Sequence, residues 1–140
     1  MKKVVKFGGS SLASAEQFKK VGEIIRSDEG RRYVVPSAPG KRFNSDTKVT
    51  DMLYQCYALA EQGKDFDNEL KAIKERYYEI IHGLSLDLSL NEEFKTIKKN
   101  FQEKAGSDYA ASRGEYLNGI VMANYLGYEF LDAAQYIFFH

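Results

Sequence analysis

Residues 3–11 read Lys3-Val4-Val5-Lys6-Phe7-Gly8-Gly9-Ser10-Ser11, and this stretch decides the fold class. An apolar run ends abruptly at two glycines and two hydroxyl side chains, and a predicted helix begins after them at Ser14. This order of strand, glycine-rich turn and helix presents backbone N–H groups to a phosphate in α/β proteins. Lys6 is predicted near the carboxyl end of the strand, where open parallel sheets bind their ligands.

The bulk composition is that of a neutral globular chain. The sequence has 140 residues, 44% of them hydrophobic and 29% charged, which is enough for one domain with a core. Lysine plus arginine and aspartate plus glutamate both total 20, so the zero net charge gives no electrostatic case for a nucleic-acid partner or an anionic membrane. Neither a signal peptide nor a run of about 20 apolar residues is recognisable. We therefore expect a cytoplasmic protein without a nucleic-acid or membrane partner.

The cysteine and histidine content predicts no metal site. Cys56 is the single cysteine, so it cannot form an internal disulfide, and no group of cysteines and histidines has metal-ligand spacing. Cys56 lies on a predicted apolar helix face. We therefore expect a buried thiol rather than a nucleophile.

Outward from the first strand, predicted at residues 3–7, strands and helices alternate. Further strands are predicted at 32–35 and 128–131, and a last apolar run lies at 136–139. Helices are predicted at about 14–28, 48–62, 66–82, from 89 onward, and at 107–126. The predicted N-caps are Ser14, Ser89 and Ser107, and the predicted helix ends are Gly63 and Gly127. Two prolines and a glycine predict an irregular chain at 36–40.

This alternation predicts an α/β fold with a parallel sheet covered by helices on both faces. The narrow apolar stripes of two helices predict a helical hairpin at about 66–104. In the first helix, one apolar stripe is predicted from Phe18, Val21, Ile24 and Ile25. Three or four strands would leave an apolar sheet edge unpaired. We therefore expect residues 1–140 to be the front portion of a larger domain, with packing of 136–139 into the core as the alternative.

The opening loop is the first candidate site. Gly8 and Gly9 let the backbone turn tightly and approach a ligand closely, Ser10 and Ser11 offer hydroxyl donors, and Lys6 offers a mobile positive charge. A Walker A motif is absent. From the residues alone, a plain strand-to-helix turn with a solvated lysine is an equal alternative.

The second candidate joins Ser37-Ala38-Pro39-Gly40-Lys41 to the later Lys48-Val49-Thr50-Asp51. Small and hydroxyl residues there leave space and donors for a small polar ligand. The Thr50 hydroxyl is predicted in the first turn of a helix, where it could cap the helix or face the crevice. An ordinary surface loop before a capped helix is the simpler alternative.

The third candidate is Ser112-Arg113-Gly114-Glu115-Tyr116-Leu117-Asn118, inside the helix predicted at 107–126. A glycine inside a helix costs about 1 kcal/mol relative to alanine, and Gly114 and Gly119 both carry that cost. They leave Glu115 on a face of small residues. Close approach of another backbone or of a ligand amine would explain the pattern, and tight helix–strand packing with Glu115 at the rim explains it equally well.

Together these three segments resemble the aspartokinase family of the amino acid kinase superfamily. Residues 6–11 are similar to its K-F-G-G-[TS]-S start, residues 37–41 and 48–53 to its second-strand loop and following helix, and residues 112–117 to its S-x-G-E-x-L segment. The order and separation also match. The resemblance implies the parallel-sheet αβα sandwich of the amino acid kinase, or carbamate kinase-like, type. It implies that residues 1–140 form an incomplete front portion of the catalytic domain, without a regulatory ACT domain.

The family reaction moves the γ-phosphoryl group of ATP, used with Mg²⁺, to the side-chain carboxylate of L-aspartate. The product is 4-phospho-L-aspartate, and the step opens lysine, threonine and methionine biosynthesis. The resemblance implies that Lys6 is catalytic and stabilises charge on the transferring group. It implies that ATP phosphates are bound by Lys6, Phe7, Gly8, Gly9 and Ser10. It implies that aspartate is bound by Ser37, Thr50 and Glu115, with Glu115 taking the ammonium.

Two other functions remain open alongside this one. A kinase for another small acid, such as glutamate, would share the superfamily fold, although the threonine-bearing helix and the S-x-G-E segment argue against it. A non-catalytic small-molecule binding or assembly module would use the same loops structurally. Most of the ATP pocket is expected beyond these residues, so we expect poor turnover from this chain alone and a partner in a homo-oligomer or in the rest of the catalytic domain.

Overall fold

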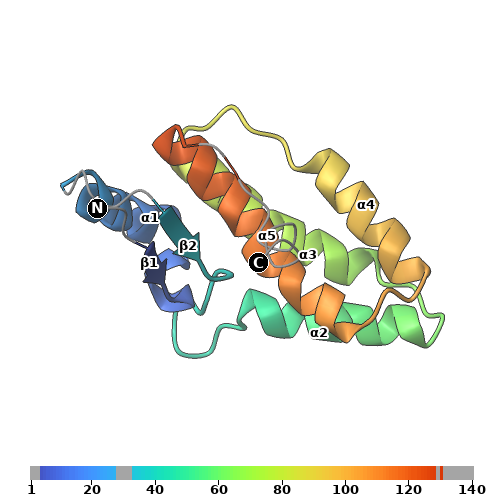
Figure 1. Cartoon of the computed structure of the whole chain (residues 1–140). Coiled ribbons are helices and arrows are strands. Elements are labelled where there is room, and N and C mark those ends of the chain that lie inside the picture. Colours follow the sequence, from blue (N-terminus) through green and yellow to red (C-terminus); the bar gives the residue numbers. More distant parts are fainter. Residues whose placement is uncertain (1–3, 28–32, 129, 131–140) are drawn as a thin grey trace.

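The computed structural model describes residues 4–27, 33–128 and 130, and within them the fold is α/β, as predicted. Two strands, β1 (Val4–Phe7) and β2 (Tyr33–Pro36), flank a short 3₁₀ helix, η1 (Gly9–Leu12), and α1 (Ala15–Arg26). Four further helices follow: α2 (Val49–Glu61), α3 (Asp67–Gly83), α4 (Asn91–Gln102) and α5 (Ser107–Leu126). Figure 1 shows the strands and α1 at one end of the molecule, with α2 to α5 extending from them as a longer helical part.

The two strands pair in parallel, which confirms the predicted strand direction. Lys6 lies opposite Val35, and Phe7 lies opposite Pro36. The prediction that Pro36 already belongs to the irregular segment is wrong, because Pro36 is the last residue of β2. A proline fits there because the next amide, that of Ser37, donates the bond to the Phe7 carbonyl at 3.0 Å.

Helix α1 begins at its predicted cap. The Ser14 hydroxyl accepts a hydrogen bond from the Gln17 amide at 3.3 Å, which satisfies one of the free N–H groups of the first turn. Phe18, Val21 and Ile25 are buried as predicted. The prediction for Ile24 is wrong, because its side chain is 46% exposed. Ile24 lies about 100° around the helix from Ile25, outside the stripe that faces the core.

Two other predicted caps are wrong. Helix α4 has Leu90 as its N-cap, and the Ser89 hydroxyl accepts instead from the amide of Asn91 at 3.3 Å. Helix α5 has Gly106 as its N-cap, with φ of 110° and no side-chain cap, so Ser107 is already its first helical residue. The predicted end of α5 is confirmed, because Gly127 adopts the left-handed conformation that favours glycine.

Helices α3 and α4 run antiparallel and are joined by side-chain contacts towards both ends. The start of α3 meets the end of α4 in an ion pair between Asp67 and Lys98 at 2.9 Å. Near the other end, the Tyr78 hydroxyl accepts from the Leu90 amide at 2.9 Å and donates to Asn91 Oδ1 at 3.0 Å. These bonds fix where α4 begins relative to α3.

One hydrophobic core joins the helical part to the strand end. Its largest fully buried side chains come from η1 and every α-helix, and include Leu12, Phe18, Ile25, Leu53, Ile73, Tyr77, Ile97, Phe101 and Leu117. Cys56 is fully buried among them, as predicted, and burial raises the pKa of its thiol to about 12. A buried, protonated thiol fits a packing role in the core better than a nucleophile.

Two sequence predictions concern residues that lie partly or wholly outside the described ranges. The strand predicted at 128–131 includes residues outside the described ranges, and the apolar run at 136–139 lies wholly outside them. Among the described helices, none is long and apolar enough to cross a membrane.

Candidate functional site

The segment Ser37–Gly40 is where the three predicted motifs meet. Its Gly40 amide donates to the Gly9 carbonyl of the opening loop at 2.8 Å, and its Pro39 carbonyl accepts from the Val49 amide at the start of α2 at 3.0 Å. Its Ser37 carbonyl accepts from the Asn118 side chain of α5 at 2.7 Å. The carboxyl ends of both strands, the start of α2 and the middle of α5 are therefore tied to one short stretch of backbone.

The opening loop and this segment touch backbone to backbone. A Cβ added at Gly40 would lie 2.7 Å from the Gly9 carbonyl carbon, and one added at Gly9 would lie 2.8 Å from the Ala38 carbonyl oxygen. Both positions therefore require glycine for packing. Gly8 differs, because an added Cβ there would meet nothing within 4 Å. The loop is thus closed on one side and open at Gly8.

Lys6 and Ser10, which border the opening loop, are both exposed. Lys6 is central in β1, and its side chain pairs with no other residue of the described ranges. Phe7 is half-buried against the core. A free lysine beside an open glycine turn can approach a bound anion without first breaking an ion pair.

Thr50 is half-buried in the first turn of α2. The N-cap of α2 is Lys48, and no side chain caps it, so the Thr50 hydroxyl is not used as a cap. Of the two alternatives open for this hydroxyl, the structure excludes capping. The uncapped N-terminus of a helix favours negative charge.

Glu115 is exposed on α5, while the glycine before it is buried. A Cβ at Gly114 would lie 2.6 Å from the Ala38 Cβ, so α5 approaches the Ser37–Gly40 segment through this glycine. The buried Tyr77 hydroxyl donates to the Gly114 carbonyl at 2.8 Å and holds the helix in place. Gly114 therefore serves close packing, and Glu115 lies beside that contact with its carboxylate in solvent.

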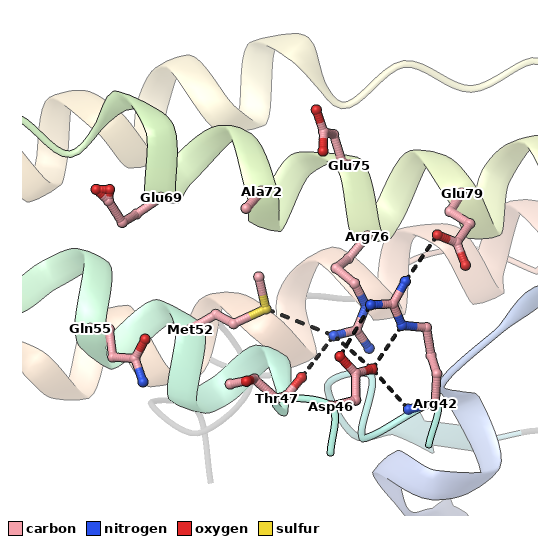
Figure 2. A pocket seen from close by; sticks show the side chains of 10 residues that line it. All are labelled: Arg42, Asp46, Thr47, Met52, Gln55, Glu69, Ala72, Glu75, Arg76 and Glu79. Carbon is pink, nitrogen blue, oxygen red and sulfur yellow. Dashed lines mark hydrogen bonds and ion pairs between the residues drawn. The ribbon is translucent and has the colours of Figure 1, made fainter. Parts of the chain in front are cut away.

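A pocket of about 390 Å³ lies between the loop after β2 and helices α2 and α3 (Figure 2). It is lined by Arg42, Asp46, Thr47, Met52, Gln55, Glu69, Ala72, Glu75, Arg76 and Glu79. None of the predicted site residues lines it. A smaller pocket of about 120 Å³, between α4 and α5, contains none of them either. The structure brings the predicted motifs together around Ser37–Gly40, while neither of these two pockets is lined by Lys6 or Glu115.

Three polar residues that sequence reasoning left without a role lie around this segment, and two of them, Asn118 and Arg76, are buried. Asn118 is fully buried, and its Oδ1 has no hydrogen-bond partner. Arg76 is 5% exposed and donates to the Gly40 carbonyl at 2.6 Å. The Asp46 carboxylate accepts from Arg42 at 2.7 Å, and this bond holds the pKa of Asp46 well below its ordinary value. A usable signal for Arg76 was its position on the apolar stripe of α3, between Ile73 and Ile80.

The described residues also lack a metal-binding cluster. No three histidine, cysteine, aspartate or glutamate side chains come together there in a way that could hold a metal ion. The groups of the opening loop that could bind an anion are backbone amides and the exposed Lys6.

Comparison with known proteins finds a family that matches the chain. The sequence model of the amino acid kinase family matches residues 1–140. Aspartokinase 3 of Bacillus subtilis is 39% identical over 137 residues, which are 94% of this chain and 30% of that protein. The chloroplastic aspartokinase 1 of Arabidopsis thaliana is 32% identical, over 95% of this chain and 25% of that protein.

Solved structures show the same likeness in three dimensions. The aspartate kinase of Clostridium acetobutylicum superposes with a TM-score of 0.87 at 54% identity, over 91% of this chain and 29% of that one. Aspartokinase III of E. coli, solved with aspartate and ADP, superposes with a TM-score of 0.71 at 25% identity, again over 91% of this chain and 29% of that one. The chain therefore spans less than a third of the length of these relatives.

Proposed function

This chain belongs to the amino acid kinase family, and we propose that it forms the phosphate-loop and aspartate-binding part of an aspartate kinase. The observation that carries the proposal is the convergence on Ser37–Gly40. Gly40 bonds to Gly9 of the opening loop, and Ser37 bonds to Asn118, one helical turn beyond Glu115. The solved relative with aspartate and ADP supports this choice of substrates.

The proposed reaction transfers the γ-phosphoryl group of ATP to the side-chain carboxylate of L-aspartate. A carboxylate oxygen of the substrate attacks phosphorus, the bond to the β-phosphate oxygen breaks, and ADP leaves. The substrate supplies the nucleophile, so the protein contributes positioning and charge neutralisation. Lys6 would neutralise charge on the moving group, while the amides of Gly8 and Gly9 and the Ser10 hydroxyl would bind phosphate oxygens.

The amino acid would lie on the other side of Ser37–Gly40. Its ammonium would pair with the exposed Glu115 carboxylate, and the Thr50 hydroxyl, which is free of a capping role, would bind a carboxylate with the help of Ser37. Magnesium is held in such enzymes largely by substrate phosphates and one or two carboxylates. The described residues offer no cluster for it, so it would enter with ATP, and no step here depends on it.

The test is a phosphorylation assay on the intact gene product, with hydroxylamine to trap the acyl phosphate as a hydroxamate. We expect product with L-aspartate and much less with glutamate or N-acetylglutamate. Lys6→Ala should lower kcat by about 10²–10³-fold, the cost of losing one preorganised charge-stabilising group. Thr50→Ala and Glu115→Ala should chiefly raise KM for aspartate. Lys19→Ala, an exposed lysine on α1, is the matched control.

Two results would contradict the proposal. Equal turnover of glutamate and aspartate would favour a kinase for another small acid. Aspartate binding without turnover, unaffected by Thr50→Ala and Glu115→Ala, would favour a non-catalytic binding module.

A further inference from the structure

The loop that joins β2 to α2 is closed by one buried side chain from a distant helix. Arg76 of α3 donates through Nη2 to the Gly40 carbonyl at 2.6 Å and through Nη1 to the Thr47 carbonyl at 2.8 Å. These carbonyls stand at the two ends of the loop 40–47. Figure 2 shows the guanidinium reaching down from α3 between Thr47 and Asp46.

The positive charge of Arg76 is buried, and removing a charge from water costs free energy. Its side chain is 5% exposed, and burial, followed by the nearby positive charge of Arg42, lowers its pKa from the ordinary value. Its ion pair with Asp46 is long, at 3.6 Å, because that carboxylate is already bound by Arg42 at 2.7 Å. A buried charge with so little ionic compensation is weak evidence for a stabilising role. Its closest acceptors are neutral backbone carbonyls.

What Arg76 does fix is the spacing between the loop ends. Gly40 at one end bonds to Gly9 of the proposed phosphate loop. Thr47 at the other end lies three residues before Thr50, in the proposed aspartate site. A planar guanidinium with two donors in a fixed fork holds both carbonyls in one geometry, which a lysine ammonium does not reproduce.

We propose that Arg76 is a positioning residue for phosphoryl transfer, holding the phosphate loop and the start of α2 at the separation that in-line attack requires. This inference rests on the proposed function and deepens it. It assigns the buried guanidinium no contact with substrate: Arg76 acts through the Gly40 and Thr47 carbonyls. Displacement of two bound reactants by about 1 Å can cost about 10²-fold in rate.

The experiment compares Arg76→Ala and Arg76→Lys with Tyr57→Phe in the intact gene product. Tyr57 is also buried and also holds one backbone group of a distant segment, the Gly106 amide at 2.8 Å, but it lies away from the loop 40–47. Both arginine variants should lose about 10- to 100-fold in kcat, with KM for ATP and aspartate changed much less. Tyr57→Phe should lose stability and keep kcat.

Chemical rescue separates positioning from folding. The pocket beside Arg76 has a volume of about 390 Å³, so millimolar methylguanidinium can reach the space left in Arg76→Ala. We expect it to restore part of kcat, whereas methylammonium should not. In the same variant, hydrogen exchange should speed up at the amides of Arg42 and Asp46, which are both bonded within the loop.

The outcomes distinguish the two proposals. If the wild-type protein makes no acyl phosphate, the proposed function fails. If hydrogen exchange in the loop 40–47 is also unchanged in Arg76→Ala, Arg76 does not hold the loop, and this inference fails as well. If the wild type is active and the folded arginine variants keep their kcat, this inference alone fails. Should Arg76→Ala not fold, Arg76→Lys decides: full kcat overturns the inference, and reduced kcat in a folded variant whose Arg42 and Asp46 amides exchange faster supports it.

Discussion

Two charged side chains of the loop 40–47, Asp46 and Arg42, make most of the side-chain hydrogen bonds described within it. The Asp46 carboxylate accepts three hydrogen bonds from Arg42, one from the backbone amide at 2.9 Å and two from the guanidinium at 2.7 and 3.1 Å. The same guanidinium reaches Glu79 of α3 at 3.1 Å. The loop is therefore held by charged groups that depend on the ionisation of one aspartate.

Asp46→Asn should make the free energy of unfolding less dependent on pH in the acid range. Because the folded pKa of Asp46 is lowered, its stabilisation is fully present above the unfolded pKa of about 4 and is lost as pH falls below that value. At pH 7 the variant should be less stable by about 1–3 kcal/mol, and the difference should shrink below pH 4. Urea unfolding between pH 2 and 7 measures this. Glu75→Gln, an exposed carboxylate of the same pocket, is the control, and parallel curves for wild type and Asp46→Asn would contradict the prediction.

Gly40→Ala tests the contact between the two loops. The added Cβ would meet only backbone atoms, at 2.7 to 2.9 Å, so nothing flexible can yield. We expect a loss of about 1–3 kcal/mol in the free energy of unfolding, as for other overpacked sites. Gly8→Ala is the control: its φ of −75° suits alanine and the space is open, so its stability should be unchanged or slightly higher. Equal stability of the two variants would show that the loops do not touch in solution.

At the scale of elements, α5 is placed against the Ser37–Gly40 segment by the absence of a side chain. Gly114 packs on Ala38, and Asn118 one turn later bonds to the Ser37 carbonyl. The helix could not approach so closely with a larger residue at Gly114. This explains why a helix of 20 residues tolerates an interior glycine at this position.

A double-mutant cycle on this contact has a definite expected sign. Gly114→Ala places a Cβ 2.6 Å from that of Ala38 and should cost about 1–3 kcal/mol. Adding Ala38→Gly removes the clashing atom, so the double variant should be more stable than the sum of the single changes predicts. Denaturant unfolding of the four proteins gives the interaction energy. If the effects of the two substitutions on the free energy of unfolding simply add, the Gly114 Cβ does not clash with Ala38.

Most elements followed from the sequence, and the errors share a cause. Apolar periodicity and glycine ends placed all five α-helices to within a few residues, because these signals are local. Ile24, Ser89 and Ser107 were misassigned, since exposure and cap choice depend on neighbours that packing brings in. Arg76 and Asn118 could not be assigned a role for the same reason: their partners, Gly40 and Ser37, lie 36 and 81 residues away.

For the whole molecule, the described chain presents a sheet of two strands with apolar side chains in solvent. Val4 is 68% exposed, Tyr33 42% and Val35 38%. Two strands are few for a stable sheet, and exposed apolar strand faces favour association with other structure. The relatives that this chain matches are more than three times as long.

The 140 residues expressed by themselves should therefore turn over aspartate poorly or not at all. The proposed phosphate loop is part of these residues, but the described sheet that would hold it rigid has two strands, and catalysis by positioning needs rigidity. The hydroxamate assay on this purified polypeptide is the measurement, with Lys6→Ala as the control for contaminating kinase. Steady product formation that Lys6→Ala abolishes would show that these residues suffice.

The hydrogen bond from Gly40 to Gly9 joins two residues that have no side chains. A substitution at either glycine adds a side chain that would clash with the backbone, so its effect cannot be separated from the loss of the hydrogen bond. Semisynthesis offers a cleaner route, because exchanging the Gly40 amide for an ester deletes one proton donor and leaves the shape intact. The link between the proposed phosphate loop and the proposed aspartate site thus runs partly through main-chain atoms, which side-chain substitutions do not remove.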